Sequence, residues 1–185
     1  NEVYNYSELL LFAEKIVHQE GNYDGLFIDP YNSLRIDMAQ GKNINSHEYH
    51  YEAASEFLTF SNRMNMAVWL NMHAITEAQR MKGLDGLPLA PSAAMTEGGG
   101  KFVNRADCFL TFHRKVASPE YETRKTMEFH VRKIRETETG GECTVWDQPF
   151  MFRMNESNTG FSTYTPQGVL YKPLMLKRIQ GELVL

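Results

Sequence analysis

Apolar residues recur at helical spacing in two stretches of the chain. Positions 9, 10, 12, 13, 16 and 17 are apolar, which predicts an amphipathic helix with Ser7 as its N-cap and Gly21 just past its end. A second helix is predicted over residues 47–65, where Asn45 and Glu48, three positions later, form the start of a capping box.

Short apolar runs bounded by turn residues predict strands. Residues 25–28 (GLFI) form the first, which stops at Asp29 and Pro30, and residues 66–74 (MAVWLNMHA) contain the second. We expect both strands to be buried, and their order around the second helix predicts parallel pairing through a crossover. Further strands, several with one exposed face, are predicted within residues 108–116, 125–135, 143–155 and 161–166. The sheet would therefore pass from parallel to antiparallel near its end.

Two stretches lack a regular period. Residues 76–101 are rich in Gly, Pro and small residues, and a loop of that length inside a compact domain is usually functional or mobile. The last stretch, residues 167–185, is compatible with either a tail or a partner-binding segment.

The composition is that of a globular protein. The chain has 185 residues, 42% of them hydrophobic and 23% charged, which is enough for one domain with a sizeable core. Cys108 and Cys143 lie far apart without the spacing of a metal site, which favours a reduced intracellular protein. The longest apolar run near the start is too short to cross a bilayer, so we expect a soluble, cytoplasmic protein with no membrane partner.

Charge is distributed unevenly along the chain. The net charge is −4, yet residues 101–135 hold nine Lys and Arg against four Asp and Glu. The acidic total argues against a generally basic nucleic-acid binder, whereas the basic stretch fits either a solvated face or a local surface for nucleic acid.

Two polar residues end the two predicted parallel strands. Asp29 follows the first strand, where a carboxylate can hold Mg²⁺ through water in a phosphate-binding enzyme; alternatively it caps the turn before Pro30. His73 closes the second strand in the same way, although a single histidine is more often a satisfied core or surface residue. Adjacent strand ends would present an acid and an imidazole to one crevice.

Two other patterns are excluded. His47 and His50 are three residues apart rather than four, so HEYH is not a zinc-protease motif and is assigned to a solvated helix start. The segments GGGKFV and AQGKNI are not phosphate-binding loops, because Met95 and Ile36 stand where the first glycine is needed and neither lysine precedes Ser or Thr. A loop that cradles a triphosphate is therefore expected to lie outside these residues.

The order of four motifs resembles a known family. GLFIDP, MAVWLNMHA, MTEGGGKFVNRADCFLTFHRK and VRKIRETETGG are similar to the C-terminal half of the RecA-like ATPase domain of replicative hexameric DNA helicases, the DnaB type and the phage primase-helicases. The resemblance covers roughly residues 8–165, so we assign residues 1–165 to a partial ATPase domain and residues 166–185 to a C-terminal tail.

The resemblance implies roles at the nucleotide site. Asp29 corresponds to the Walker B aspartate, which holds Mg²⁺ through water, and His73 to the polar sensor of the γ-phosphate. Lys133 and Arg135 correspond to the Lys-x-Arg pair that reaches into the neighbouring subunit's nucleotide site.

The third motif implies contacts with single-stranded DNA. Gly98, Gly99, Gly100, Lys101 and Arg105 occupy the family's channel-facing segment, which Asp107 closes. The family usually has an arginine where this chain has Glu97. In the first loop, Arg35 and Lys42 are weaker candidates for a DNA contact.

These observations predict an α/β fold with a RecA-like core in three layers, a mainly parallel sheet and an antiparallel extension. The resemblance implies a ring-forming, ATP-dependent DNA helicase that uses ATP and Mg²⁺, binds single-stranded DNA and assembles into a hexamer. We expect this chain alone to hold no cofactor tightly and to hydrolyse little or no ATP. Another RecA-like ATPase, such as a recombinase or clock-type enzyme, and a degenerate non-enzymatic assembly module stay open as alternatives.

Overall fold

A computed structural model describes residues 3–21, 23–37, 46–145 and 148–164, and the backbone of three later strands at 170–173, 177–179 and 182–184. The chain forms two compact units. The N-terminal unit comprises Asn1–Gln79 and Pro91–Phe109, and the C-terminal unit comprises Arg80–Ala90 and Leu110–Leu185. We describe each unit by itself.

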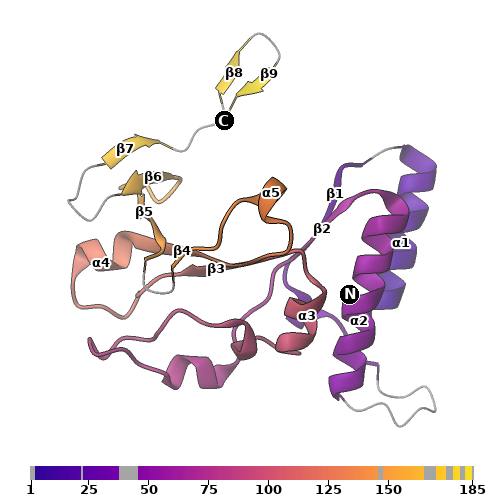
Figure 1. Cartoon of the computed structure of the whole chain (residues 1–185), viewed down its shortest axis with the longest axis horizontal. Helices are drawn as coiled ribbons and strands as arrows, with labels where there is room; N and C mark the ends of the chain where they lie inside the picture. The colour runs from indigo at the N-terminus through magenta and orange to yellow at the C-terminus, as the bar shows by residue number, and fades with distance from the viewer. Residues whose placement is uncertain are drawn as a thin grey trace. The chain divides into compact units, whose positions relative to one another are not determined.

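The helices and strands follow one another in a mixed order (Figure 1). The first part of the chain contains α1 (Tyr6–Glu20), β1 (Gly25–Ile28), α2 (Ser46–Met64), β2 (Ala67–Leu70) and α3 (Gly100–Arg105), with 3₁₀ turns η1 (Tyr31–Ser33), η2 (Thr76–Arg80) and η3 (Ala93–Met95). The remainder contains β3 (Cys108–His113), α4 (Tyr121–Lys125), β4 (Thr126–Ile134), α5 (Thr137–Gly140), β5 (Phe150–Met154), β6 (Phe161–Tyr164), β7 (Leu170–Pro173), β8 (Lys177–Ile179) and β9 (Glu182–Val184).

Helix α1 is confirmed, but its predicted N-cap is wrong. Asn5, rather than Ser7, caps the helix, because the Asn5 side chain accepts a hydrogen bond from Glu8 N at 2.8 Å and Glu8 Oε2 accepts one from Asn5 N at 3.0 Å. This reciprocal pair satisfies two backbone donors at once, which Ser7 inside the helix cannot do. Gly21 ends α1 with φ 105°, as predicted.

The core of the N-terminal unit lies between α1 and α2, which run side by side in Figure 1. Leu10 and Ala13 of α1 meet Ala53, Phe57 and Phe60 of α2 in one buried cluster. The predicted second helix is thus confirmed; Asn45, the first member of its predicted capping box, lies outside the described residues. In the part of the chain that the structure describes, no helix is long and apolar enough to span a bilayer.

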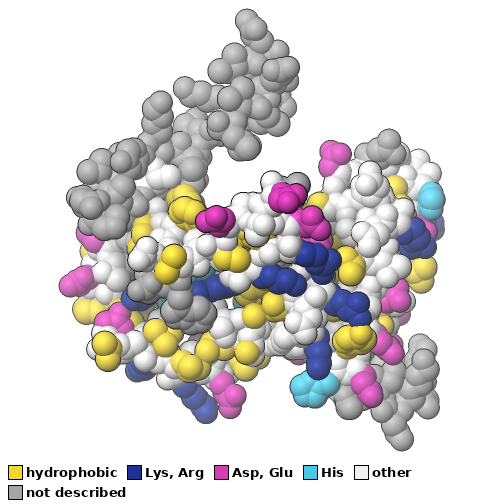
Figure 2. All heavy atoms as spheres, in the orientation of Figure 1, with side chains coloured by type: hydrophobic (Ala, Val, Ile, Leu, Met, Phe, Trp, Pro, Cys, Tyr) yellow, Lys and Arg dark blue, Asp and Glu magenta, His cyan; other side chains and the backbone are white. Residues whose placement is uncertain are grey.

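Strands β1 and β2 pair in parallel, as predicted, but they are not buried on both faces. Their register joins Leu26 to Val68 and Ile28 to Leu70, and these side chains pack on the helical core. Successive side chains point to opposite faces, so Phe27 and Trp69 lie on the other face, 64% and 52% exposed, with their rings stacked at 6.4 Å. Hydrophobic side chains are visible at several places on the molecular surface (Figure 2).

The C-terminal unit is built on a sheet with the strand order β3-β4-β5-β6-β7. The β4–β5, β5–β6 and β6–β7 pairs are antiparallel, which confirms the antiparallel extension. The parallel part that the structure describes is the two-stranded β1–β2 sheet, so the expected mainly parallel sheet is not found among the described strands. Short connections such as residues 155–160 can join only antiparallel neighbours. Strand β7 lies within the residues predicted as a tail, and the predicted boundary at residue 165 falls outside the described residues.

Strand β4 is covered on both faces, which corrects the prediction of one exposed face. His130 and Val131 are consecutive, so they point to opposite faces, yet both are buried. On the polar face Glu128 lies 3.3 Å from His130 Nε2 and 3.8 Å from Lys115 Nζ, and Lys115 also pairs with Asp85 at 2.8 Å. Charged groups thus cover the polar face by pairing with one another.

The loop after β1 is anchored by a group of aromatic side chains that we call the Tyr31 cluster: Tyr31, His50, Phe57 and Phe102. Tyr31 is 3% exposed, its hydroxyl shares a hydrogen bond of 2.8 Å with His50 Nδ1, and its ring meets that of Phe102 at 4.7 Å. His50 is only 2% exposed, so its assignment to a solvated helix start is wrong, whereas His47 is exposed. His50 lies on the inner face of α2 with Ala53, Ala54 and Phe57, at the spacing of one helical stripe.

We predict that Tyr31→Phe lowers the free energy of unfolding by about 1–3 kcal/mol, because it leaves the buried His50 Nδ1 without its partner. Urea unfolding of the two proteins measures the difference. Tyr23→Phe is the matched control: its hydroxyl donates to Glu20 at 2.9 Å on the surface, so its loss should change stability by less than about 0.5 kcal/mol. Equal effects of the two substitutions would contradict a special role for the buried bond.

Candidate functional site

Asp29 lies at the carboxyl end of β1, exposed to solvent. Asn71, just past the end of β2, donates from Nδ2 to Asp29 Oδ1 at 3.0 Å. The backbone links the same two loops, since Asn71 N donates to Ile28 O at 2.9 Å and Tyr31 N donates to Asn71 O at 2.8 Å. The Asp29 carboxylate is therefore held at one edge of the parallel pair by the neighbouring strand's loop.

His73 lies at the same edge, three residues beyond the end of β2, with an exposed side chain. Its backbone N–H donates to Asn32 Oδ1 at 2.8 Å. Asn32 belongs to η1, directly after β1, and so connects the loop that carries Asp29 to the loop that carries His73. That both residues line one nucleotide site stays a prediction.

The glycine segment is attached to the His73 loop. Thr96 forms an antiparallel bridge with Ala74, and Ile75 N donates to Met95 O at 2.8 Å. Glu97 Oε2 accepts a hydrogen bond of 2.5 Å from Asn32 Nδ2. The three predicted candidates Gly98, Gly99 and Gly100 follow immediately, so this segment begins beside the strand ends.

The three glycines differ in their surroundings. Gly98 has φ 73°, and a Cβ there would lie 2.9 Å from both His50 Cβ and Phe102 Cε2, so it packs directly on the Tyr31 cluster. Gly99 also has positive φ, at 53°, whereas Gly100 begins α3 in open space. Gly98 therefore has a packing role that the sequence pattern alone did not show.

Helix α3 carries the two predicted basic contacts. Lys101 and Arg105 are four residues apart and so share one face of the helix. The Arg105 guanidinium lies over the ring of Tyr51 on α2, 4.8 Å from its centroid, and donates a hydrogen bond to the Tyr51 hydroxyl. Asp107 follows α3 on the surface, just before β3. Tyr51 is exposed at 47%, so a cation and an aromatic ring are presented together.

Lys133 and Arg135 belong to the C-terminal unit. Lys133 is half-buried within β4, with the same parity as Val131, and Arg135 is exposed one residue past the strand end. The chain then turns into α5, where a Cβ on Gly140 would lie 2.7 Å from Ile134 Cγ2. The strand thus carries the predicted pair to its end, and only Arg135 lies beyond it.

The acidic residues fit a water-mediated magnesium role better than a direct metal centre. Among the described residues, no group of three or more His, Cys, Asp or Glu side chains is arranged to hold a metal ion. Mg²⁺ usually keeps several waters and needs only one or two carboxylates besides substrate phosphates, a set that the exposed Asp29 can join. The fit is therefore to an ion that arrives with a nucleotide.

Burial determines the charge of the cluster beneath the site. It lowers the pKa of His50, against the opposing effect of Glu97, so the imidazole is neutral near pH 7. Burial also raises the pKa of the Tyr31 hydroxyl. The hydrogen bond between them therefore joins two neutral groups.

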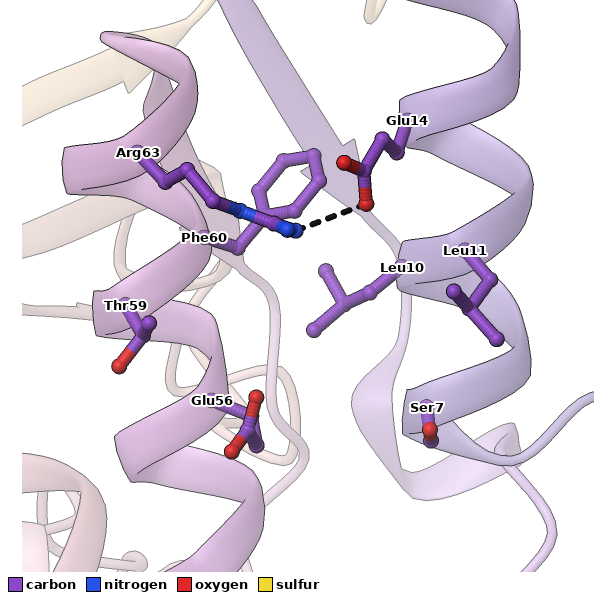
Figure 3. Close-up of a pocket in the computed structure, with 8 residues that line it drawn as sticks. All are labelled: Ser7, Leu10, Leu11, Glu14, Glu56, Thr59, Phe60 and Arg63. Carbon is purple, nitrogen blue, oxygen red and sulfur yellow. Dashed lines mark hydrogen bonds and ion pairs between the residues drawn. The ribbon is translucent and has the colours of Figure 1, made fainter.

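Two other features were compared with this site. A groove of about 280 Å³ lies between α1 and α2 (Figure 3) and is crossed by an ion pair of 2.8 Å between Arg63 and Glu14. The residues that line it are Ser7, Leu10, Leu11, Glu14, Glu56, Thr59, Phe60 and Arg63, and it contains no predicted site residue. Arg35, the weaker DNA candidate, donates to Glu8 at 2.9 Å, and Lys42 lies outside the described residues.

We predict that Gly98→Ala destabilises the chain by about 3 kcal/mol or more, since the new methyl group meets both positive-φ strain and the side chains of the Tyr31 cluster. Gly86→Ala is the matched control, because Gly86 has φ 74° with nothing within 4 Å of the added Cβ. It should lose only the conformational part, about 1 kcal/mol. Urea unfolding compares the two, and equal losses would contradict the packing role of Gly98.

Comparison of the sequence with known proteins gave no match: no protein-family model matches it, and no curated protein is significantly similar.

The structure does match solved proteins. It is similar to the ATPase domain of a DnaB-type helicase with a TM-score of 0.66 and 10% sequence identity, over 88% of this chain and 52% of that one. The chain therefore spans about half the length of this relative. At that identity the likeness concerns the fold alone: this chain has the fold of part of an ATPase domain.

Proposed function

We propose that the chain is the C-terminal portion of the RecA-like ATPase domain of a ring-forming, ATP-dependent DNA helicase. The structural relative is itself the ATPase domain of a DnaB-type helicase. The observation that supports the proposal most is the position of Asp29 and His73 at the carboxyl ends of paired parallel strands within that fold. Ligands of open α/β sheets bind at this end.

Two residues would act on the nucleotide. Phosphoryl transfer depends mainly on positioned charges, and a bound Mg²⁺ would neutralise charge on the phosphates. Asp29, oriented by Asn71, would hold the waters of this ion, and the His73 imidazole would contact the γ-phosphate. Because the sequence has no loop that cradles a triphosphate, ATP would bind tightly only with the rest of the domain, and the isolated chain would hydrolyse little or none.

Single-stranded DNA is the proposed polymer partner. Lys101 and Arg105 on one face of α3 would neutralise successive phosphates, while the preceding glycines allow the backbone to approach the strand. Tyr51, beneath Arg105, adds an exposed ring of the kind on which bases stack.

The assembly would be a ring in which each nucleotide site is completed by the next subunit. Arg135, exposed past the end of β4, is suited to this role because guanidinium binds phosphate oxygens through two donors and stays protonated. Lys133 would add a second positive charge from the same strand.

We predict that Lys101→Ala/Arg105→Ala weakens binding of the chain to a labelled single-stranded oligonucleotide. The slope of log K against log salt should become shallower by about 1.4, since each phosphate contact contributes about 0.7. Fluorescence anisotropy at several salt concentrations measures both quantities. Lys15→Ala/Lys82→Ala removes the same charge elsewhere on the surface and should leave the slope unchanged. An unchanged slope in the first variant would remove α3 from the DNA site, and preference for duplex DNA would favour a recombinase-type ATPase.

We predict that Arg135→Ala lowers ATP hydrolysis by the complete ring about 10³-fold or more, while nucleotide binding changes little. Mixing this variant with Asp29→Ala should restore part of the activity, because a mixed ring contains interfaces with Asp29 intact on one subunit and Arg135 intact on its neighbour. Steady-state hydrolysis of the mixture measures the recovery. Mixed rings without any recovery would show that Arg135 does not act across the interface.

A further inference from the structure

Asn32 uses both ends of its side-chain amide to join two segments distant in sequence. Oδ1 accepts from the backbone N–H of His73 at 2.8 Å, and Nδ2 donates to Glu97 Oε2 at 2.5 Å. The orientation of the amide is fixed by its partners, since a backbone N–H can only donate and a carboxylate can only accept. Each half of the amide therefore has one partner that the other half cannot serve.

The backbone at Asn32 is held firmly in place. Its neighbour Tyr31 is buried in the Tyr31 cluster, and Tyr31 N donates to Asn71 O in the loop after β2. Tyr31 thus anchors the turn to the core, while Asn32 extends from it to His73 and Glu97. A side chain with a fixed base and two partners transmits displacement of one partner to the other.

The Glu97 end is equally constrained. Gly98 packs on His50 and Phe102, so the carboxylate that Asn32 holds is attached directly to the segment that leads into α3. An arginine at position 97 could not accept the hydrogen bond from Asn32, because guanidinium has donors only. The acidic residue at this position is thus accounted for by its contact with Asn32.

We propose that Asn32 is a positioning residue that couples the His73 loop at the strand ends to the Glu97–Lys101 segment. The inference rests on the proposed function for its meaning: a change at the nucleotide would reach the DNA-binding segment through this amide, and the reverse. Such coupling is reciprocal, because binding free energies are linked in both directions.

The first test needs neither ATP nor DNA. Amide hydrogen exchange at His73, followed by NMR on the 185-residue chain, should become about threefold faster or more in Glu97→Ala, because Asn32 loses one of its two partners. The same substitution should have no added effect in an Asn32→Ala background, where the bridge is already absent. No change in either background, or equal changes in both, would overturn the inference.

The second test reverses the polarity of the bridge. Asn32→Asp keeps an acceptor for His73 N–H but places a carboxylate against Glu97. In the complete protein it should lower the ratio of ATP hydrolysis with single-stranded DNA to that without DNA by about fivefold or more. Asn32→Asp/Glu97→Gln should restore the ratio, because the glutamine amide can donate to the aspartate.

The outcomes separate the two proposals. An active ATPase whose DNA stimulation is the same in Asn32→Asp and the unaltered protein would overturn the coupling role of Asn32 while leaving the proposed function intact. A complete protein that neither hydrolyses ATP nor binds single strands would overturn the proposed function; the hydrogen-exchange cycle would still decide whether Asn32 links His73 to Glu97.

Discussion

The hydrogen bond between Tyr31 and His50 is the contact on which the geometry of the candidate site depends. It is buried and measures 2.8 Å, and both rings pack against Phe102 of α3. Three segments far apart in sequence, the turn after β1, helix α2 and helix α3, meet at this pair. A polar bond inside an apolar cluster also favours one arrangement over others, since a shifted packing would leave two buried polar atoms unpaired.

The exposed polar residues of the site inherit their positions from this buried pair. Tyr31 directs one side of its turn inward, so Asn32, the next residue, faces the loops that carry His73 and Glu97. On α2, His50 supports Gly98 from below, which fixes where the glycine segment starts. The strand-end loops and the segment before α3 are therefore parts of one packed arrangement, although each is irregular in backbone structure.

Periodicity predicted the helices and strands well because it reports which faces are apolar. It could not show what covers each face: a run such as GLFI reads the same whether one face or both are buried, and Phe27 proved exposed. Asn5 and Ser7 are both good N-caps, and only the pairing of Asn5 with Glu8 decides between them. The contacts of Asn32 and His50 join residues separated by tens of positions, so no local pattern reveals them. Asp29 and His73 were found because strand ends are recognisable in sequence.

The outer face of the β1–β2 pair has a different physical status from the inner one. Leu26, Ile28, Val68 and Leu70 hold the helices, whereas Phe27 and Trp69 add nothing to that packing. Smaller polar residues at those two positions would leave the core unchanged and make the surface more soluble. The stacked aromatic rings instead make this face ready to adhere to any apolar surface, including a second copy of the chain at high concentration.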